Sequence, residues 1–479
     1  MFYYRLRAAK GDSAATKAWK RRCTERLLAL RQALKAHIQG EGGSTRDELR
    51  WMRLATWNIR EFPSGKYGSR LPESYYYIAE IISHFDIVAL QEVREDRSNL
   101  ETVMRILGRY DWDYIITDVT EGTGGNRERM AFVYNTKKVR FRNVAGEITL
   151  AGKDRIAYPH EGRLSVAKGF KHLLPEGTAF PATQAETRKR SGKHKLTQDL
   201  VLTLPEGTNI AAPQKTSLVI PAGSEVKLDS DGNLVLSGKA LQTALKKATL
   251  KLPGGSIVGD DLQFARTPFV VEFQSGWFKF ILCTVHIYYG SDKTGLERRK
   301  AEIRALTKFL AERASSETDS DAESFFFVLG DFNIVSQSHA TWDALHSNGF
   351  QVPEALSEIP EGSNVKRDKA YDQIAYWTDP KRTRARHGSV STVDVGNAGI
   401  FDFFETVFRQ GADDDPDGED EAAYSKLMLA MQAEGQKVKK KKPWKYKEWR
   451  TFQMSDHLPM WIELRTDFTD EYLEMIGES

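Results

Sequence analysis

Short apolar runs and longer stretches with apolar residues at helical spacing alternate along the chain from residue 52 onward. RLATWNI at 53–59 and DIVALQEV at 86–93 predict buried strands, because their apolar residues run almost unbroken. PESYYYIAEIISHF at 72–85 and GLERRKAEIRALTKFLAERA at 295–314 predict helices. A further helix is predicted at 98–108, and further strands at 110–116, 129–135, 267–275, 277–287, 324–334, 371–377 and 457–464. Helices mixed with hairpin strands predict a layered α/β sandwich.

The first fifty residues predict one amphipathic helix. Apolar residues recur at helical spacing within 14–38, with basic residues between them: Trp19, Cys23, Leu27, Leu30 and Leu34. The glycine-rich GEGG at 40–43 ends the helix. We expect it to pack on the body of the protein or on a partner, with a basic membrane-surface helix as the alternative.

The alternation of strand and helix patterns stops between residues 144 and 262. Turn-like segments with glycine begin at Leu204, Ile220, Leu236 and Leu252, a constant step of 16 residues. Short β-branched runs lie between them, which predicts stacked hairpins or a small β module. We interpret this interval as an inserted β-rich subdomain.

Charge is concentrated in residues 411–450, which we expect to form a charged loop. An acidic block at 411–421 precedes KVKKKKPWKYKEWR at 437–450, where aromatic residues alternate with lysines. Such a pattern suits a loop that contacts phosphates and stacks on bases. The expected nucleic-acid contacts are Lys440, Lys441, Lys442, Trp444, Lys445 and Tyr446.

Composition adds little beyond a globular class. The chain has 479 residues, 40% hydrophobic and 28% charged, and a net charge of +3, which is too small to imply a nucleic-acid partner by itself. Cys23 and Cys283 are the only cysteines, so neither a disulfide framework nor a zinc site is expected. No run is apolar enough to span a membrane, and no secretory signal is apparent, so we expect a soluble cytoplasmic protein.

Polar side chains follow or open several of the predicted strands. They are Asn58, Glu92, His286, Asp331, Asn333, Asp372, Asp456 and His457. Strand ends of an α/β sandwich converge on one rim, where loops form the ligand crevice. Each residue alone has an ordinary explanation, such as a turn, but together they indicate a metal site for phosphoryl transfer. Carboxylate and amide oxygens without thiolates favour Mg²⁺, with Mn²⁺ and Ca²⁺ as alternatives.

Eight short motifs follow one another in a fixed order: TWNIREF, LQEVR, ERMAFVY, FARTPF, TVHIYYG, LGDFNI, YDQIAY and SDHLPM. This series resembles that of the endonuclease/exonuclease/phosphatase family over residues 52–143 and 263–466. The resemblance implies a DNase I-like four-layered α/β sandwich, with two packed mixed sheets flanked by helices. The implied organisation is an N-terminal helical extension at 1–50, a catalytic domain at 51–143 and 263–470, and the insertion at 144–262.

The resemblance also implies roles for individual residues. Within the family the motifs are most similar to those of deoxyribonuclease I-like nucleases. On that basis Glu92, Asn58 and Asp456 are expected to hold the metal, and Arg94, Arg266 and Tyr288 to bind substrate phosphates. The expected carboxylate–imidazole pairs are Glu128 with His286 and Asp372 with His457. Asp331 and Asn333 are expected to orient or deprotonate the attacking water, or to bind a second metal.

Three functions are compatible with these residues. The first is a metal-dependent DNA endonuclease that hydrolyses phosphodiester bonds by in-line attack of water. The second is a phosphatase or phosphodiesterase acting on a lipid head group or a small phosphate ester. The third is an effector nuclease subunit regulated by a protein partner, which docks on the insertion or on the N-terminal helix. DNA versus RNA, and single versus double strands, stay open.

Overall fold

The computed structural model describes residues 2–39, 50–63, 66–119, 127–150, 158–159, 163–165, 187–190, 193–203, 217–228, 234–235, 249–251, 256–257, 263–290, 293–316, 325–377, 393–411, 418–435 and 443–478. The chain divides into two compact units. The first comprises Met1–Thr149, Ala265–Tyr288 and Leu306–Ser479, and the second Leu150–Phe264 and Tyr289–Ala305. The second unit therefore contains most of the interval expected as an insertion, together with residues 289–305, which the sequence did not point to.

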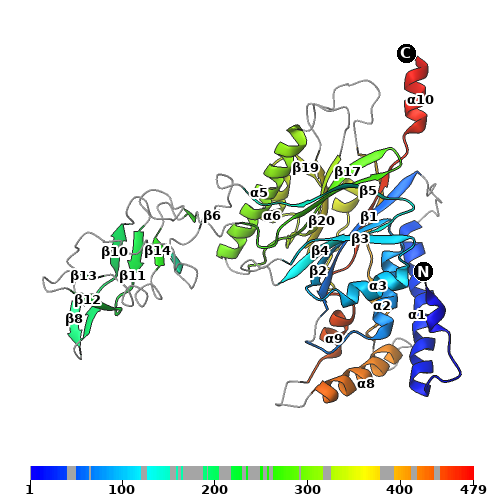
Figure 1. Cartoon of the computed structure of the whole chain (residues 1–479), viewed down its shortest axis with the longest axis horizontal. Coiled ribbons are helices and arrows are strands. Elements are labelled where there is room, and N and C mark those ends of the chain that lie inside the picture. The colour runs from blue at the N-terminus through cyan, green and yellow to red at the C-terminus, as the bar shows by residue number, and fades with distance from the viewer. Residues whose placement is uncertain are drawn as a thin grey trace. The chain divides into compact units, whose positions relative to one another are not determined.

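Two six-stranded mixed sheets form the centre of the first unit (Figure 1). The first sheet has the order β21 (Val395–Ile400), β22 (Met460–Arg465), β1 (Trp51–Phe62), β2 (Ile87–Arg94), β4 (Glu128–Asn135), β3 (Trp112–Ile116). The second has the order β19 (Phe350–Gln351), β20 (Asp372–Trp377), β18 (Phe325–Asp331), β17 (Phe278–His286), β16 (Phe269–Ser275), β5 (Arg140–Glu147). Within them, β1 and β2 are parallel, as are β17 and β18, and the predicted hairpin of β16 and β17 is confirmed.

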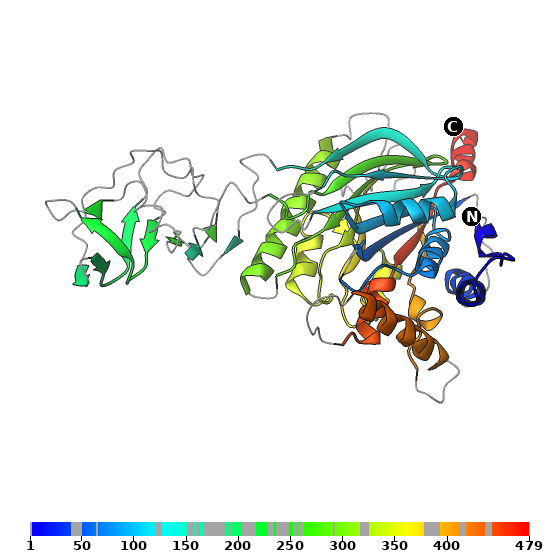
Figure 2. The ribbon, with the colours of Figure 1, turned by 60° about the horizontal axis from the view of Figure 1, so that its bottom comes forward.

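Helices cover the outer faces of the two sheets. The helices within the described residues are α1 (Ala14–Gln39), α2 (Pro72–Ile82), α3 (Ser98–Leu107), α5 (Lys293–Ser316), α6 (Ala340–His346), α7 (Glu354–Ser357), α8 (Gly418–Gly435), α9 (Tyr446–Gln453) and α10 (Thr469–Glu478), with short 3₁₀ helices η1 (Tyr3–Leu6) and η6 (Phe403–Glu405). Figure 2 shows α2 and α3 on one side of the paired sheets, and α6 with the later part of α5 on the other. The predicted α/β sandwich is confirmed.

Aromatic side chains fill the space between the sheets. Phe132 of β4 lies edge-to-face with Phe273 of β16, with ring centroids 5.6 Å apart. Phe273 in turn stacks on Phe280 of β17. These rings are almost completely buried, so they contribute a large share of the hydrophobic stabilisation that holds the two sheets together.

The predicted N-terminal helix is α1, and its apolar stripe packs on the body of the protein. The buried residues of α1 are Cys23, Leu27, Leu30, Leu34 and Ile38. Arg22 and Arg31 of this helix pair with two buried acids of α2, Glu73 and Glu80, at 2.7 and 2.8 Å. Because the apolar face is already covered, α1 does not offer it to a membrane surface.

The second unit contains short antiparallel strands. They are β6 (Tyr158–Pro159), β7 (Arg163–Ser165), β8 (Thr187–Arg190), β9 (Lys193–Leu196), β10 (Leu200–Thr203), β11 (Ser217–Ile220), β12 (Glu225–Leu228), β13 (Leu234–Val235), β14 (Thr249–Lys251) and β15 (Ser256–Ile257). The turn that begins at Ile220 joins β11 to β12, which belong to different sheets, and Gly223 there has φ of +77°. The glycine-containing segments that begin at Leu204, Leu236 and Leu252 lie largely outside the described residues.

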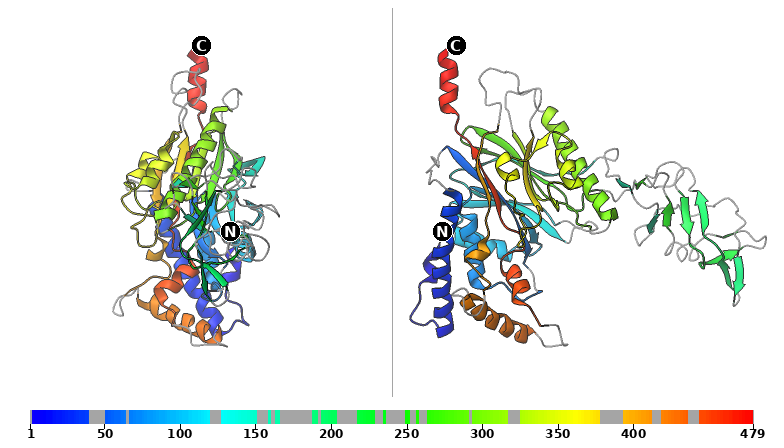
Figure 3. Two further views of the ribbon diagram at one scale, coloured as in Figure 1. Left: turned by 90° about the vertical axis from the view of Figure 1, so that its left-hand side faces the viewer. Right: turned by 180° about the vertical axis from the view of Figure 1, so that it is seen from behind.

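The expectation of a charged loop at 411–450 is wrong for part of that segment, because it contains α8 and the start of α9. Asp420 of the acidic block is buried, and it pairs with Arg26 at 2.6 Å and Arg409 at 3.3 Å. Figure 3 shows the C-terminal helix α10 extending away from the sheets of the first unit. Among the described helices, none is both long and apolar enough to cross a lipid bilayer.

Candidate active site

The polar residues predicted at strand ends lie at one edge of the sandwich. Asn58 and Glu92 stand near the carboxyl ends of the parallel strands β1 and β2, and His286 and Asp331 end the parallel strands β17 and β18. Because two parallel strands of each sheet point the same way, their ends present these side chains side by side. Asn58 of the first sheet thereby reaches Asp331 of the second, with Nδ2 3.0 Å from Oδ2.

A break in strand pairing redirects Glu92. The register of β2 shifts between Leu90 and Val93, and Glu92 has φ of +62°, a left-handed value that is rare for residues other than glycine. The backbone N–H of Glu61 donates to Glu92 Oε2 at 2.7 Å. Burial raises the pKa of Glu92, and the charges of Glu128 and Asp456 add to this, while His286 opposes it. A cation beside Glu92 would offset the cost of keeping it ionised.

Asn58 provides the test of whether the site suits such a cation. Its Nδ2 donates to Glu92 Oε1 at 3.3 Å as well as to Asp331. Its Oδ1 is buried and has no hydrogen-bond partner among the described residues. An orphaned buried amide oxygen beside two carboxylates matches the all-oxygen ligand sets of Mg²⁺, Mn²⁺ and Ca²⁺. The residues therefore fit a divalent cation.

The first carboxylate–imidazole pair is present. His286 Nδ1 lies 3.0 Å from Glu128 Oε2, and both side chains are almost fully buried. Arg266 Nε donates to the same oxygen at 2.5 Å, and Arg94 lies 3.5 Å from the other oxygen. Burial alone would raise the pKa of Glu128, but the adjacent His286 and Arg266 lower it to about 2. Glu128 is thus an anion held beside the His286 ring, where it favours the imidazolium form.

The second pair is also present. His457 Nδ1 lies 2.7 Å from Asp372 Oδ2, and Ser363 Oγ donates to that same oxygen at 2.6 Å. Burial disfavours the imidazolium, but the charges of Asp372 and Asp331 raise the pKa of His457 well above its ordinary value. His457 is therefore held protonated and can act as a hydrogen-bond donor or a general acid.

Asp331 lies between the two histidines. Its Oδ2 is 3.5 Å from His286 Nε2 and 3.8 Å from His457 Nε2. Its Oδ1 accepts a hydrogen bond from the backbone N–H of Asn333 at 2.8 Å, and Asn333 Nδ2 donates to the carbonyl of Ile287. The result is one chain of alternating acids and imidazoles that runs across both sheets.

Two predicted site residues form ion pairs that the sequence did not indicate. Asp456 is 39% exposed, and its Oδ2 pairs with Arg60 at 3.2 Å, although its charge acts on Glu92. Arg266 is 9% exposed and bonded to Glu128, so it supports that acid instead of standing open to a substrate phosphate. Arg94 is 25% exposed at the rim of the site, and Tyr288 follows β17 in a half-buried position.

The expected nucleic-acid segment is only partly described. Lys440, Lys441 and Lys442 lie outside the described residues. Tyr446 is buried and its hydroxyl donates to the carbonyl of Arg409, so the expectation that it stacks on bases is wrong. Its side chain forms the buried face of α9. Trp444 is half-buried against Tyr67, with ring centroids 5.3 Å apart, and Lys445 is exposed.

Sequence reasoning missed two residues that join the pieces of the site. Arg70 is buried and donates to the backbone carbonyls of Arg60, Glu61 and Met454, at 2.6, 3.2 and 3.4 Å. Ser455 Oγ donates to the carbonyl of Asn58 at 2.6 Å and accepts from the backbone N–H of His457 at 3.1 Å. Together they tie the end of β1 to the loop that carries Asp456 and His457. Ser455 precedes Asp456 in a recognised motif, but nothing in the sequence points to Arg70.

The sandwich of two mixed sheets, with acid–imidazole pairs beside a cluster of oxygen ligands, defines a hydrolase of phosphate esters. The chain belongs to the Endonuclease/Exonuclease/phosphatase family, whose model matches residues 55–395. That match ends before Asp456 and His457, which the rest of the first unit supplies. Enzymes of this family generally depend on divalent metal ions.

Several solved structures are similar to the chain. One is an endonuclease/exonuclease/phosphatase family protein from Bacteroides thetaiotaomicron, at 14% identity and a TM-score of 0.40, covering 87% of this chain and 98% of that one. A mannosyl-6-phosphatase from the same organism has 14% identity and a TM-score of 0.39, with 86% and 99% covered. The human Nocturnin catalytic domain with bound sulfate has 12% identity and a TM-score of 0.38, with 88% and 99% covered. No curated protein sequence matches the chain.

Proposed function

We propose that the protein is a divalent-metal-dependent phosphodiesterase that cleaves nucleic acid, with DNA as the first substrate to test. The observation that carries this proposal is the chain of acids and imidazoles centred on Asp331, with the oxygen cluster of Asn58 and Glu92 beside it. Such a chain supplies, within one site, both a protonated donor and anions able to accept a proton.

Each residue has a task in this reaction. Glu92 and Asn58 would hold the cation, with Asp456 as a further ligand. When bound, the cation supplies neutralisation of the charge that grows on the phosphoryl oxygens. His457, paired with Asp372, donates a hydrogen bond or proton to the phosphate or the leaving oxygen. Asp331 lies within reach of both histidines and is the candidate to orient the attacking water.

Two features favour a polymeric phosphate over a small ester. Arg94 lies at the rim beside Glu128, where a guanidinium can grip a phosphate that flanks the cleaved bond. The basic, aromatic segment that contains Trp444 and Lys445 continues through α9 directly into Asp456 and His457. We expect a nucleic-acid strand bound at the site to pass this segment, whose exposed cations would suit a phosphate backbone.

The experiment is a substrate panel on the full-length protein. Supercoiled plasmid, linear DNA, single-stranded DNA and RNA are incubated with Mg²⁺, Mn²⁺, Ca²⁺ or EDTA. Nicking of plasmid with Mg²⁺ or Mn²⁺, and its loss in EDTA, is the expected result. Glu92→Gln and His457→Ala should each lower the rate by about 100-fold or more, because a ligand or a proton donor is lost. His346→Ala, on the distant helix α6, is the matched control and should cleave at the wild-type rate.

The same variants separate the alternatives. Phosphate release from phosphoinositides and from sugar phosphates is measured in parallel. If plasmid stays intact while a small ester is hydrolysed, and Glu92→Gln abolishes that hydrolysis, the site assignment holds and the nucleic-acid substrate is wrong. Cleavage of DNA that persists in both site variants would contradict the site itself.

A further inference from the structure

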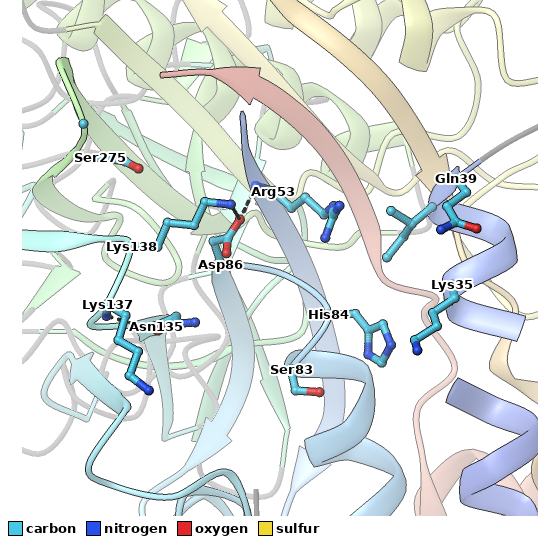
Figure 4. Close-up of a pocket in the computed structure, with 12 residues that line it drawn as sticks. Lys35, Gln39, Arg53, Ser83, His84, Asp86, Asn135, Lys137, Lys138 and Ser275 are labelled. Carbon is cyan, nitrogen blue, oxygen red and sulfur yellow. Dashed lines mark hydrogen bonds and ion pairs between the residues drawn. The ribbon is translucent and has the colours of Figure 1, made fainter. Parts of the chain in front are cut away.

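A cavity lies in the first unit, away from the edge of the sandwich that holds the candidate active site. It has a volume of about 750 Å³ and is lined by residues next to the amino-terminal ends of β1 and β2, among them Arg53 and Asp86 (Figure 4). The active-site residues Asn58 and Glu92 stand near the opposite ends of these strands. Glu92 lies six positions after Asp86, which corresponds to about 20 Å along an extended strand. A molecule held here does not reach the active site.

Cations dominate the lining of this cavity. Four lining side chains are basic and one is acidic: Lys35, Arg53, Lys137, Lys138 and Asp86. The remaining titratable lining group is His84, whose pKa is lowered by burial, so its neutral form is favoured. The neutral polar residues include Gln39 and Asn135, which carry amide donors. The cavity is therefore rich in hydrogen-bond donors and poor in acceptors.

The acids around the cavity occupy only some of the hydrogen-bond donors that line it. Asp86 is paired with Lys138 at 3.1 Å and also accepts from the backbone N–H of Arg53. Lys137 pairs with Asp111 at 2.8 Å, but its side chain is 66% exposed, so a phosphate can replace this weak surface pair. Arg53 pairs with Glu463 only through Nε, at 3.1 Å, and its two terminal nitrogens have no partner among the described residues. Lys35, exposed on α1, has no ion pair within the described part of the chain either. These groups come from separate elements and are free to bind acceptor oxygens.

We propose that this cavity binds a small molecule that carries at least two phosphate groups, such as a pyrophosphate or a nucleoside polyphosphate. Its volume lies within the range of small-ligand sites, about 300 to 1,000 Å³. In Figure 4, Lys35 and Arg53 approach from one side and Lys137 and Lys138 from another, so two anionic groups can be contacted at once. Guanidinium and ammonium donors bind phosphate oxygens more strongly than neutral donors do. This site is independent of the proposed nuclease reaction.

The test is direct binding measured by calorimetry on the full-length protein in EDTA, so that no hydrolysis occurs. The probes are inorganic phosphate, inorganic pyrophosphate and adenosine triphosphate. We expect pyrophosphate and the triphosphate to bind about 10-fold or more tightly than phosphate, because two groups are engaged. Lys35→Gln should weaken pyrophosphate binding, and Lys35→Gln combined with Arg53→Gln and Glu463→Gln should weaken it by about 10-fold or more.

Three variants make the result decisive. Glu463→Gln accompanies Arg53→Gln so that no buried acid is left without its partner, and a thermal melt verifies that the protein is folded. Arg21→Gln changes an exposed cation of α1 outside the cavity and should leave binding unchanged. Glu92→Gln should also leave it unchanged. The proposal is overturned if no probe binds, if the Lys35 and Arg53 variants bind normally, if Glu92→Gln removes binding, or if phosphate binds as tightly as pyrophosphate.

Discussion

At the scale of single residues, Asn58 is the residue that best tests whether the site binds a metal ion. Its side-chain oxygen is buried and has no hydrogen-bond partner in the described part of the chain, a situation that costs free energy unless a ligand satisfies it. We expect Mg²⁺ or Mn²⁺ to raise the melting temperature of the wild-type protein and EDTA to lower it, because a ligand that binds the folded state stabilises it. In Asn58→Ala this shift should be much smaller. Differential scanning fluorimetry measures it without any substrate, and an equal shift in both proteins would contradict the ligand assignment.

Arg70 supports the backbone on which the candidate site residues stand. It donates to carbonyls at the end of β1 and in the loop before His457, and none of these hydrogen bonds goes to a proposed ligand atom. We predict that Arg70→Met weakens metal affinity and activity by about 10- to 100-fold, as the loss of a group that orients ligands does. Arg70→Lys should recover part of both, because an ammonium can still reach a carbonyl. Titration of Mn²⁺, monitored beside the kinetics, distinguishes this from a general loss of folded protein.

The sequence could identify the acids and histidines of the candidate site, but not the residues that hold them in place. Glu92 and Asp331 were predictable because an acid at the end of an apolar run is costly without a task. Arg70 and Ser363 act through backbone carbonyls and a single carboxylate oxygen, contacts that depend on how distant segments meet. Tyr446 misled the prediction because the surrounding lysines hid the helical spacing that buries Tyr446 and Trp449 together.

At the scale of elements, α1 is held by ion pairs whose acids are buried. Glu73 is 1% exposed and Arg22 is its partner, whereas Arg21 and Glu25 on the same helix are largely exposed. We predict that Arg22→Met lowers the free energy of unfolding by about 3 kcal/mol, because Glu73 is left buried without its cation. Arg21→Met should change it by about 0.5 kcal/mol or less. Chemical denaturation measures both, and Glu73→Gln added to Arg22→Met should restore part of the loss.

The same pair predicts a pH dependence. Burial raises the pKa of Glu73 above 4.5, and Arg22 partly opposes this rise. When a carboxyl binds its proton more tightly in the folded state, the free energy of unfolding of the protein falls as pH rises above the carboxyl's unfolded pKa. Without Arg22 the folded pKa rises further, so the cost of Arg22→Met should be small near pH 4 and should grow towards pH 7. Denaturation curves at several pH values test this, and a cost that does not change with pH would contradict it.

Most elements were predictable because their patterns are local. The strands and helices of the first unit follow from apolar runs and helical spacing, and their bounds agree with the predictions to within a few residues in most cases. Helix α8 was missed because its charged residues resemble a solvated loop. Its burial depends on Tyr424 packing against Phe408, with ring centroids 4.4 Å apart, a contact between segments that sequence patterns do not relate.

At the scale of the whole molecule, the longer segment of the second unit, Leu150–Phe264, follows β5 and precedes β16, two paired strands of the first unit. Glu147 of β5 pairs with Phe269 of β16, and the backbone N–H of Ile148 donates to the carbonyl of Pro268. A short turn can therefore replace residues 151–262. We predict that this deletion leaves the first unit folded, with a melting temperature changed by only a few degrees, and retains hydrolysis of a short substrate. Circular dichroism and the kinetic assay test it, and an unfolded product would show that the insertion is part of the folding unit.

The site draws its residues from both sheets, and Trp57 and His457, which are 400 residues apart, meet beside it through a 2.9 Å hydrogen bond. During biosynthesis the ribosome releases Asn58 and Glu92 long before Asp456 and His457. A nascent chain therefore carries the proposed metal ligands without the second imidazole, and so it lacks the complete candidate site. If the substrate is nucleic acid, translation order itself protects the messenger and the genome of the producing cell until the sandwich has closed.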